Sequence, residues 1–487
     1  MERKKASHPS WALACKRKGT ELRLLGGKYY LYEVSSKWDP EKKRSAKISG
    51  KLLGKITEAE GFVESEKAQL RKQQLKVEQV QVKEYGVASL FESIFTEVLS
   101  ALKAYFPDIW QAIICLTYGR LVYQSPLKNM SFHYSGSYLS VQYPAVNLSA
   151  KHLSSFLREL GQDRDRIVRF CRSFKIVEDC VLFDGTDLFS HSAEMELPKF
   201  SKSKFGTYDD MINLMCLFSV GQQMPVYYRL LPGNIKDVSA FRLSLMESGV
   251  KDAIVIIDKG FASEKNIKAL EDEELRFIIP LPRNSSYIDY GKMKTGDKSL
   301  FEGYFRYQGR YIWFYSCRQD KKKRVFLFLD EELRHREEGD YLNRIESKTQ
   351  DYSIEKFHRK RHAFGTIATI ENTGKNAEEV YGDYKSRGEV ETMIDSLKNI
   401  LDADRTYMQN AHTLEGWMFV NLVALKCYYA VLNLLKKHEL NRKFSPQDLF
   451  LFLSELKKVK INNDWHDTES TKKNSDLLKN IGIIPIT

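Results

Sequence analysis

Apolar residues recur along the chain with two different periods. From residue 87 to 175 they recur every three or four positions, the spacing of amphipathic helices, so residues 87–106, 109–123 and 151–160 are predicted to be helical. From residue 176 onward, short apolar runs alternate with helical stretches, which indicates buried strands. The pattern therefore predicts a helical unit followed by an α/β unit.

Five apolar runs outline the sheet of the α/β unit. The predicted strands are residues 180–183, 211–220, 225–231, 253–257 and 276–280. A short turn at residues 221–223 joins the second and third strands, and helices follow the third and the fourth. The expected order is three antiparallel strands and then two crossovers to parallel strands. We therefore expect an α/β fold with a mixed sheet flanked by helices.

The remaining segments do not follow this alternation. Residues 285–357 carry a hairpin pattern around Gln308 and Gly309, which predicts a β-rich insertion between the first part of the core and its second part at residues 358–435. The expected boundaries are 1–86 for a basic hairpin and connector, 87–175 for the helical domain, 176–284 for the first part of the core, and 436–487 for a C-terminal helical tail.

The most apolar long run, residues 417–435, has the length of a membrane span but contains Asn421, Lys426 and Asn433. A buried helix and no membrane partner are expected. Seven cysteines form no Cys-x-x-Cys pair and are odd in number, which argues against a zinc ribbon or a disulfide framework. The N-terminus lacks an apolar signal core, so a reducing cytoplasm is expected.

Positive charge is concentrated at the N-terminus. Residues 1–55 hold 15 Lys/Arg and 5 Asp/Glu, which accounts for +10 of the chain's net charge of +12. Strand-like residues 28–34 and 45–54 flank a turn with Lys42, Lys43 and Arg44, which predicts a basic hairpin that lies along a polyanion such as DNA. The alternative is a solubilising edge hairpin.

Four reactive side chains share one face of a helix predicted at residues 384–398. They fall within a stripe about 60° wide and comprise Tyr384, Arg387, Glu391 and Lys398. Asp395 lies about 40° from Glu391 and is a competing carboxylate. A solvated charged face on an ordinary amphipathic helix is the other interpretation.

Two more carboxylates, Asp184 and Asp258, follow apolar strands directly, at the position where ligands gather in α/β sheets. Together with Glu391 they form a set of three oxygen ligands, which is the preference of Mg²⁺ or, as its substitute, Mn²⁺. Two such ions support in-line phosphoryl displacement by a water or a 3′-hydroxyl. Tyr384, Arg387 and Lys398 are then candidates to hold phosphates.

Two other patterns are weaker. Trp313 and its neighbouring tyrosines could stack on unpaired bases, although strand aromatics more often belong to a core. His358 and His362 have the spacing of a metal pair, but the three cations between them would repel a metal. A basic loop is the better interpretation of that segment.

The spacing Tyr384-x2-Arg387-x3-Glu391-x6-Lys398 resembles the YREK signature of the insertion-sequence-four group of bacterial DDE transposases. Asp184-Gly-Thr and Asp258-Lys-Gly-Phe resemble the group's first two catalytic motifs. Lys259 stands where arginine is common in the group, and both keep the charge. The resemblance extends over roughly residues 175–435.

The resemblance implies an RNase H-like core in which Asp184, Asp258 and Glu391 bind two divalent metals. It also implies a homodimer in the DNA complex, terminal phosphates bound by Tyr384, Arg387 and Lys398, and a nucleoid-associated protein in a bacterial cytoplasm. Relatives hold a flipped base with an insertion-domain tryptophan, for which Trp313 is the candidate here.

The hypothesis is a cut-and-paste transposase that binds terminal inverted repeats, cleaves double-stranded DNA and joins 3′-hydroxyl ends to target DNA. The alternatives are a metal-dependent DNA nuclease without strand transfer and a catalytically silent DNA-binding protein derived from a transposase.

Overall fold

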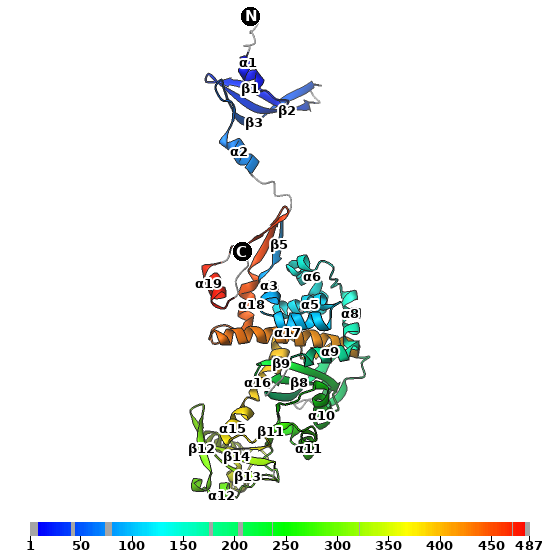
Figure 1. Ribbon diagram of the computed structural model, residues 1–487, viewed down its shortest axis with the longest axis vertical. Coiled ribbons are helices and arrows are strands. Elements are labelled where there is room, and N and C mark those ends of the chain that lie inside the picture. The colour runs from blue at the N-terminus through cyan, green and yellow to red at the C-terminus, as the bar shows by residue number, and fades with distance from the viewer. Residues whose placement is uncertain are drawn as a thin grey trace. The chain divides into compact units, whose positions relative to one another are not determined.

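The computed structural model describes residues 8–39, 44–73, 80–174, 179–202, 208–235, 237–320, 322–469 and 471–482. The chain divides into two compact units. The first comprises Met1–Gln81 with Lys460–Asp464, and the second comprises Val82–Val459 with Trp465–Thr487. Figure 1 labels the helices and strands of both units.

The first unit is a four-stranded antiparallel sheet in the order β1-β2-β3-β4. Its elements are α1 (Ser10–Ala14), β1 (Thr20–Leu25), β2 (Lys28–Asp39), β3 (Arg44–Thr57), β4 (Gly61–Glu64) and α2 (Glu66–Gln73). The predicted hairpin is confirmed, since β2 pairs antiparallel with β3. Arg44 begins β3, whereas Lys42 and Lys43 lie outside the described residues.

The predicted helical unit forms the start of the second unit. Its helices are α3 (Gly86–Ser93), α4 (Thr96–Tyr105), α5 (Trp110–Tyr123), η1 (Leu127–Asn129), α6 (Met130–Gly136), α7 (Leu139–Gln142), α8 (Ala150–Gln162) and α9 (Arg164–Arg172), and they follow β5 (Val80–Glu84). The single helix expected at residues 87–106 is two helices. The break occurs because the Ser93 hydroxyl bonds the Ser89 carbonyl and the Phe95 ring turns inward to pack edge-on against Phe91.

Helix α17 (Ala411–Lys437) lies between these helices and strand β9 (Figure 1). It is long and apolar enough to cross a membrane, but 78% of its apolar window is buried inside the protein. The expectation of a buried helix at residues 417–435 is therefore confirmed. Elements α18 (Pro446–Ser454), β17 (Lys457–Ile461), β18 (Asp464–Asp467) and α19 (Lys472–Asn480) complete the chain.

The central sheet has the predicted mixed topology. The strands of its first part are β6 (Cys180–Ser190), β7 (Lys199–Lys202), β8 (Tyr208–Ser219), β9 (Met224–Pro232), β10 (Ile254–Ile257) and β11 (Arg276–Leu281). The helices between them are α10 (Asp237–Ser248), η2 (Lys259–Phe261) and α11 (Glu264–Asp272). Strands β6, β8 and β9 pair antiparallel, and β10 is parallel to both β6 and β11. The fold is thus α/β with a mixed sheet and many helices.

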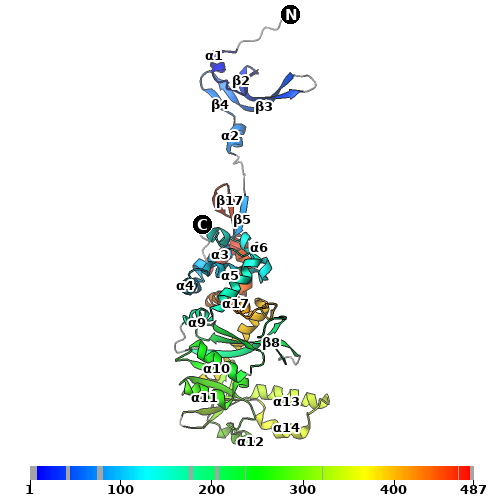
Figure 2. The ribbon, with the colours of Figure 1, turned by 90° about the vertical axis from the view of Figure 1, so that its right-hand side faces the viewer.

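The segment expected as a separate β-rich insertion extends this same sheet. Strands β12 (Gly303–Tyr307), β13 (Arg310–Arg318) and β14 (Arg324–Asp330) continue through β15 (Thr366–Glu371) onto β11. The segment also contains α12 (Gly291–Thr295), η3 (Lys298–Leu300), α13 (Glu331–Glu346), α14 (Ile354–Lys360) and, after it, η4 (Arg361–Ala363). Helices α13 and α14 lie side by side around Tyr341, Phe357 and Phe364 (Figure 2).

The chain then returns toward β6 through α15 (Ala377–Lys385), α16 (Gly388–Asp395), the π-turn η5 (Ser396–Ile400) and the short strand β16 (Arg405–Thr406). The sequence pattern predicted one helix at residues 384–398. The structure divides this segment among α15, α16 and η5. The Ser386 hydroxyl bonds the Asp383 carbonyl at the first break, and the π-turn places one more residue in the last turn. Arg387 and Glu391 nevertheless remain in contact at i, i+4.

Candidate active site

Asp184 and Asp258 lie on neighbouring parallel strands. Strand β6 pairs with β10 in a register that matches Phe183 with Ile257, so each aspartate is the next residue along its strand. Asp258 directly follows β10, as predicted. Asp184, however, lies in the middle of β6 rather than at its end, because β8 continues to pair with β6 as far as Phe189.

Arg387 joins two of the three predicted carboxylates. Its Nη2 lies 2.6 Å from Glu391 Oε1 and 3.2 Å from Asp258 Oδ1. The Nε atom of the same guanidinium is buried and has no hydrogen-bond partner. Arg387 thus neutralises the two carboxylates through a single nitrogen, Nη2.

Tyr384 lies on α15 beside this ion-pair group. Burial raises the pKa of its hydroxyl, Arg387 opposes that shift, and Asp258 and Glu391 add to it. The tyrosine is therefore protonated at neutral pH. Its hydroxyl can donate to an anion that approaches Arg387.

Lys398 lies further along the same edge of β6. Its Nζ donates to the Asp187 carbonyl at 2.7 Å. Cys216 on β8, opposite Asp184, is within electrostatic range of both Asp184 and Lys398; burial is the main reason that its pKa rises to about 12. Lys398, in the π-helix Ser396–Ile400, therefore lies close to Asp184.

The predicted metal triad is not assembled in the described residues, which contain no group of three His, Cys, Asp or Glu side chains that could hold an ion. Two carboxylates converge on one cation, the Arg387 guanidinium, and Asp184 is adjacent by strand register. The donors are carboxylate oxygens, which fit Mg²⁺ or Mn²⁺, and the guanidinium takes the place between Asp258 and Glu391 that a cation favours.

The other candidates lie elsewhere. Trp313 is on β13, partly buried, with Tyr304 5.0 Å away and Lys298 Nζ 5.1 Å above its ring. Asp395 accepts a hydrogen bond from the Asn399 side chain. Sequence reasoning missed Cys216 and the Asp187 carbonyl, because strand register across the sheet has no local signal.

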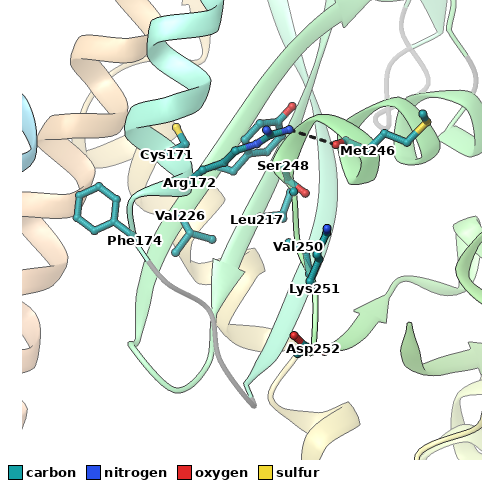
Figure 3. A pocket seen from close by; sticks show the side chains of 12 residues that line it. Cys171, Arg172, Phe174, Leu217, Val226, Met246, Ser248, Val250, Lys251 and Asp252 are labelled. Carbon is teal, nitrogen blue, oxygen red and sulfur yellow. Dashed lines mark hydrogen bonds between the residues drawn. The ribbon is translucent and has the colours of Figure 1, made fainter. Parts of the chain in front are cut away.

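A cavity of about 460 Å³ beside α9 and α10 is separate from this site (Figure 3). It is lined by Val250, Lys251 and Asp252, which precede β10, whereas Asp258 follows β10. The Arg172 guanidinium in this cavity donates to the Glu247 carbonyl at 2.8 and 3.0 Å and so satisfies the end of α10. The role of Arg172 is therefore structural.

Comparison with solved structures gives loose likenesses to two transposase assemblies. The chain is 11% identical to a piggyBac transposase in a synaptic complex with hairpin DNA, with 76% of this chain and 79% of that chain covered and a TM-score of 0.41. It is 11% identical to the Mos1 transposase in a paired-end complex with the left transposon end, with 58% and 75% covered and a TM-score of 0.16.

No curated protein matches the chain significantly. In contrast, the family model described as the transposase DDE domain matches residues 176–426, which is more than half of the 487 residues. The matched residues contain the strands and helices that carry Asp184, Asp258 and Glu391. The chain therefore belongs to the transposase DDE domain family.

Proposed function

We propose that the protein is a DNA transposase that binds the terminal inverted repeats of its insertion sequence, cleaves the DNA and joins the 3′-hydroxyl ends to target DNA. The observation that carries this proposal is the grouping of Asp258, Arg387 and Glu391 next to Asp184. Membership of the transposase DDE domain family supports the same reaction class.

The strand order supports an RNase H-like core. Strands β9, β8 and β6 are antiparallel, and β10 and β11 follow in parallel on the other side of β6. This is the arrangement that the YREK resemblance leads us to expect. It places the two aspartates at the centre of the sheet and brings the glutamate from a helix that packs on β6 and β8.

The proposed roles follow from the side chains. Asp184, Asp258 and Glu391 hold the divalent ions, Mg²⁺ or Mn²⁺, which supply charge neutralisation and activation of an oxygen nucleophile when bound. Arg387 with its guanidinium, and Lys398 with its ammonium, bind phosphate oxygens of the DNA end. Tyr384 donates its hydroxyl to the same strand.

The DNA contacts extend to other parts of the chain. We assign the basic β2–β3 hairpin, with Arg44, to the DNA backbone, and Trp313 to an unpaired base. A homodimer on paired ends and an association with the bacterial nucleoid belong to the same proposal. Its partner is double-stranded DNA, both as element ends and as target.

The decisive test is Mg²⁺-dependent cleavage of duplexes that carry the element's own ends. Asp258→Ala should abolish cleavage, whereas Asp272→Ala, an exposed carboxylate at the end of α11, should retain it. Undiminished cleavage by Asp258→Ala overturns the assignment. Precleaved 3′-hydroxyl ends supplied with a target plasmid then separate transfer from simple hydrolysis, since a nuclease yields no joined product.

One observation favours the catalytically silent alternative. Arg387 already fills the gap between Asp258 and Glu391, and no group of three metal-binding side chains exists among the described residues. A silent protein would bind ends tightly and leave them intact with Mg²⁺ and with Mn²⁺. The same cleavage assay, combined with a binding measurement, distinguishes the two.

A further inference from the structure

A second cavity, of about 600 Å³, lies where the helical unit meets the catalytic strand β6. It is lined by residues of α5 and η1, by Asp402, by residues 404–408 and by Trp417 of α17. Three cations, Arg120, Lys128 and Arg405, and two aromatic rings, Tyr407 and Trp417, face it. None of them belongs to the candidate active site.

Arg120 is the most unusual residue of this cavity because it is only 2% exposed and has neutral partners. Its guanidinium donates to the Asn421 amide oxygen at 3.0 Å, to the Ser125 carbonyl at 2.9 Å and to the Asp402 carbonyl at 3.5 Å. Burial lowers its pKa to about 10, and the Asp402 charge offsets only part of that shift. A buried cation without a bonded counter-ion is costly and is better satisfied by an anion.

The bond from Nη2 to Asp402 is the weakest of the three. At 3.5 Å it lies at the limit of hydrogen bonding, so an anionic oxygen in the cavity could replace it at little cost. Lys128 and Arg405 add exposed positive charge at the same cavity, although Arg405 also pairs with Asp404 at 3.5 Å.

Both aromatic rings are held in place by stacking. The Arg120 guanidinium lies 4.6 Å from the centroid of Trp417, and the His191 ring stacks on Tyr407 at 4.8 Å with 22° between the planes. Tyr407 is nevertheless 70% exposed. Pre-positioned aromatic rings next to cations form the usual platform for an unpaired base and its phosphate.

The cavity continues the active-site edge of β6. Asp258 is beside Asp184, Lys398 bonds the Asp187 carbonyl, and Arg405 pairs with Phe189, all along one strand. The five steps from Asp184 to Phe189 along the strand span about 17 Å. At about 3.4 Å per nucleotide step, this corresponds to about five nucleotides of a DNA strand that passes the carboxylates.

We propose that this cavity binds one nucleotide, its phosphate on Arg120 and Lys128 and its base against Tyr407. The proposal rests on the proposed function, because the expected source is an unpaired nucleotide of the DNA substrate near the cleavage site. A free nucleotide has the same chemistry and is the second source to test.

The test is a binding measurement in EDTA, which requires no catalysis. The probes are a duplex with one extrahelical 2-aminopurine nucleotide and a fully paired duplex with the same label. The intact protein should prefer the extrahelical duplex by about tenfold, with a change of 2-aminopurine fluorescence on stacking. Because cleavage is not measured, failure of the proposed function does not affect this result.

Tyr407→Ala and Lys128→Ala should each remove most of the preference for the extrahelical duplex, and Lys151→Ala, on the exposed side of α8, should leave it unchanged. Arg120→Gln should have the largest effect on this preference. If the Arg120→Gln protein does not fold, the variants of the exposed Tyr407 and Lys128 still test the proposal. If free deoxyadenosine monophosphate displaces the extrahelical duplex, the cavity binds free nucleotides. If it does not, the cavity binds a nucleotide of DNA. Equal affinity for the two duplexes, or a preference unchanged in Tyr407→Ala and Lys128→Ala, overturns the proposal.

Discussion

At the scale of single residues, the site depends on one arginine shared by two carboxylates. Asp258 and Glu391 would repel each other without a cation between them, and Arg387 supplies that cation from the turn before α16. A divalent ion that binds both carboxylates must displace the guanidinium from at least one of them. Arg387 is then free to bind phosphate, so metal and DNA binding should be coupled.

This coupling predicts the behaviour of Arg387→Gln. Without Mg²⁺ the variant should be less stable by about 1 kcal/mol or less, since Glu391 is half-exposed and solvent screens the pair. With Mg²⁺ its Tm should rise more than that of the unmodified protein, because the ion no longer competes with a guanidinium. Thermal unfolding in EDTA and in Mg²⁺ measures both effects.

The matched control is Arg344→Gln, which removes an arginine–carboxylate pair of the same spacing on α13, where Arg344 Nε lies 2.9 Å from Asp340. It should show no additional Mg²⁺ effect. Equal Mg²⁺ shifts in the unmodified protein and in Arg387→Gln would show that the guanidinium and the ion do not share a site.

Lys426 gives a prediction about pH. Its side chain is fully buried in α17, with Nζ 3.4 Å from the Phe174 ring centroid, and burial lowers its pKa from 10.5 to about 8. Below pH 8 the lysine is charged in both the folded and the unfolded protein, so the folded state bears the full free-energy cost of a buried ammonium. As the pH rises from 8 to 10.5 the folded protein loses the proton first, so this cost disappears.

Lys426→Met should therefore stabilise the protein at pH 7, by on the order of 2 kcal/mol. The gain should shrink between pH 8 and 10.5, as measured by urea denaturation across this range. Lys437→Met, at the exposed end of the same helix, should produce no such trend. A gain that does not vary with pH would attribute the effect to packing rather than to charge.

At the scale of elements, α8 and α17 approach each other through two glycines. A Cβ added to Gly416 would lie 2.1 Å from the Leu157 carbonyl oxygen, and one added to Gly161 would lie 1.8 Å from the His412 carbonyl oxygen. Both obstacles are backbone atoms, so the helices would have to separate. Gly416→Ala should lower the free energy of unfolding by about 3 kcal/mol.

Gly339→Ala is the matched helical control, because nothing lies within 4 Å of a Cβ at that position in α13. It should stabilise the protein by about 0.5–1 kcal/mol, since alanine loses less backbone entropy than glycine. Denaturation of both variants by urea provides the comparison. A neutral Gly416→Ala would mean that the two helices are not held at backbone contact.

The element pattern shows what could be predicted from the sequence. The order of strands β6, β8, β9, β10 and β11 and their directions followed from apolar runs and connection lengths, and so did the position of Asp258 after β10, whereas β7 was not predicted. The length of β6 did not follow, because Asp184-Gly-Thr-Asp187 has turn composition and becomes strand only through its pairing with β8.

The site was less predictable than the fold. The breaks around α16 depend on local side-chain bonds and on a π-turn, which helical periodicity does not report. The Arg120 cavity had no sequence signal, since Arg120 and its partner Asn421 are 301 residues apart. The attachment of β12–β14 to the central sheet likewise depends on the antiparallel pairing of β15 with β11.

At the scale of the whole molecule, the candidate site residues and most of the net charge lie in different compact units. Residues 1–55, within the first unit, carry +10 of the chain's +12, and the candidate site lies entirely within the second unit. Sequence-independent affinity for DNA should therefore come mainly from the first unit, through release of counterions from phosphates.

This division predicts the salt dependence of DNA binding. Replacing the exposed Lys37, Lys51 and Lys55 of β2 and β3 with glutamine should reduce the slope of log affinity against log salt concentration by up to about 2.7, because each phosphate contact contributes about 0.9. The control replaces the exposed Lys151, Lys437 and Lys479 of the second unit and should change the slope much less. Fluorescence anisotropy with one duplex over a range of salt concentrations measures both slopes. If the control set lowers the slope as much as the β2–β3 set, DNA is bound mainly by the unit that holds the carboxylates, and the basic hairpin serves solubility instead.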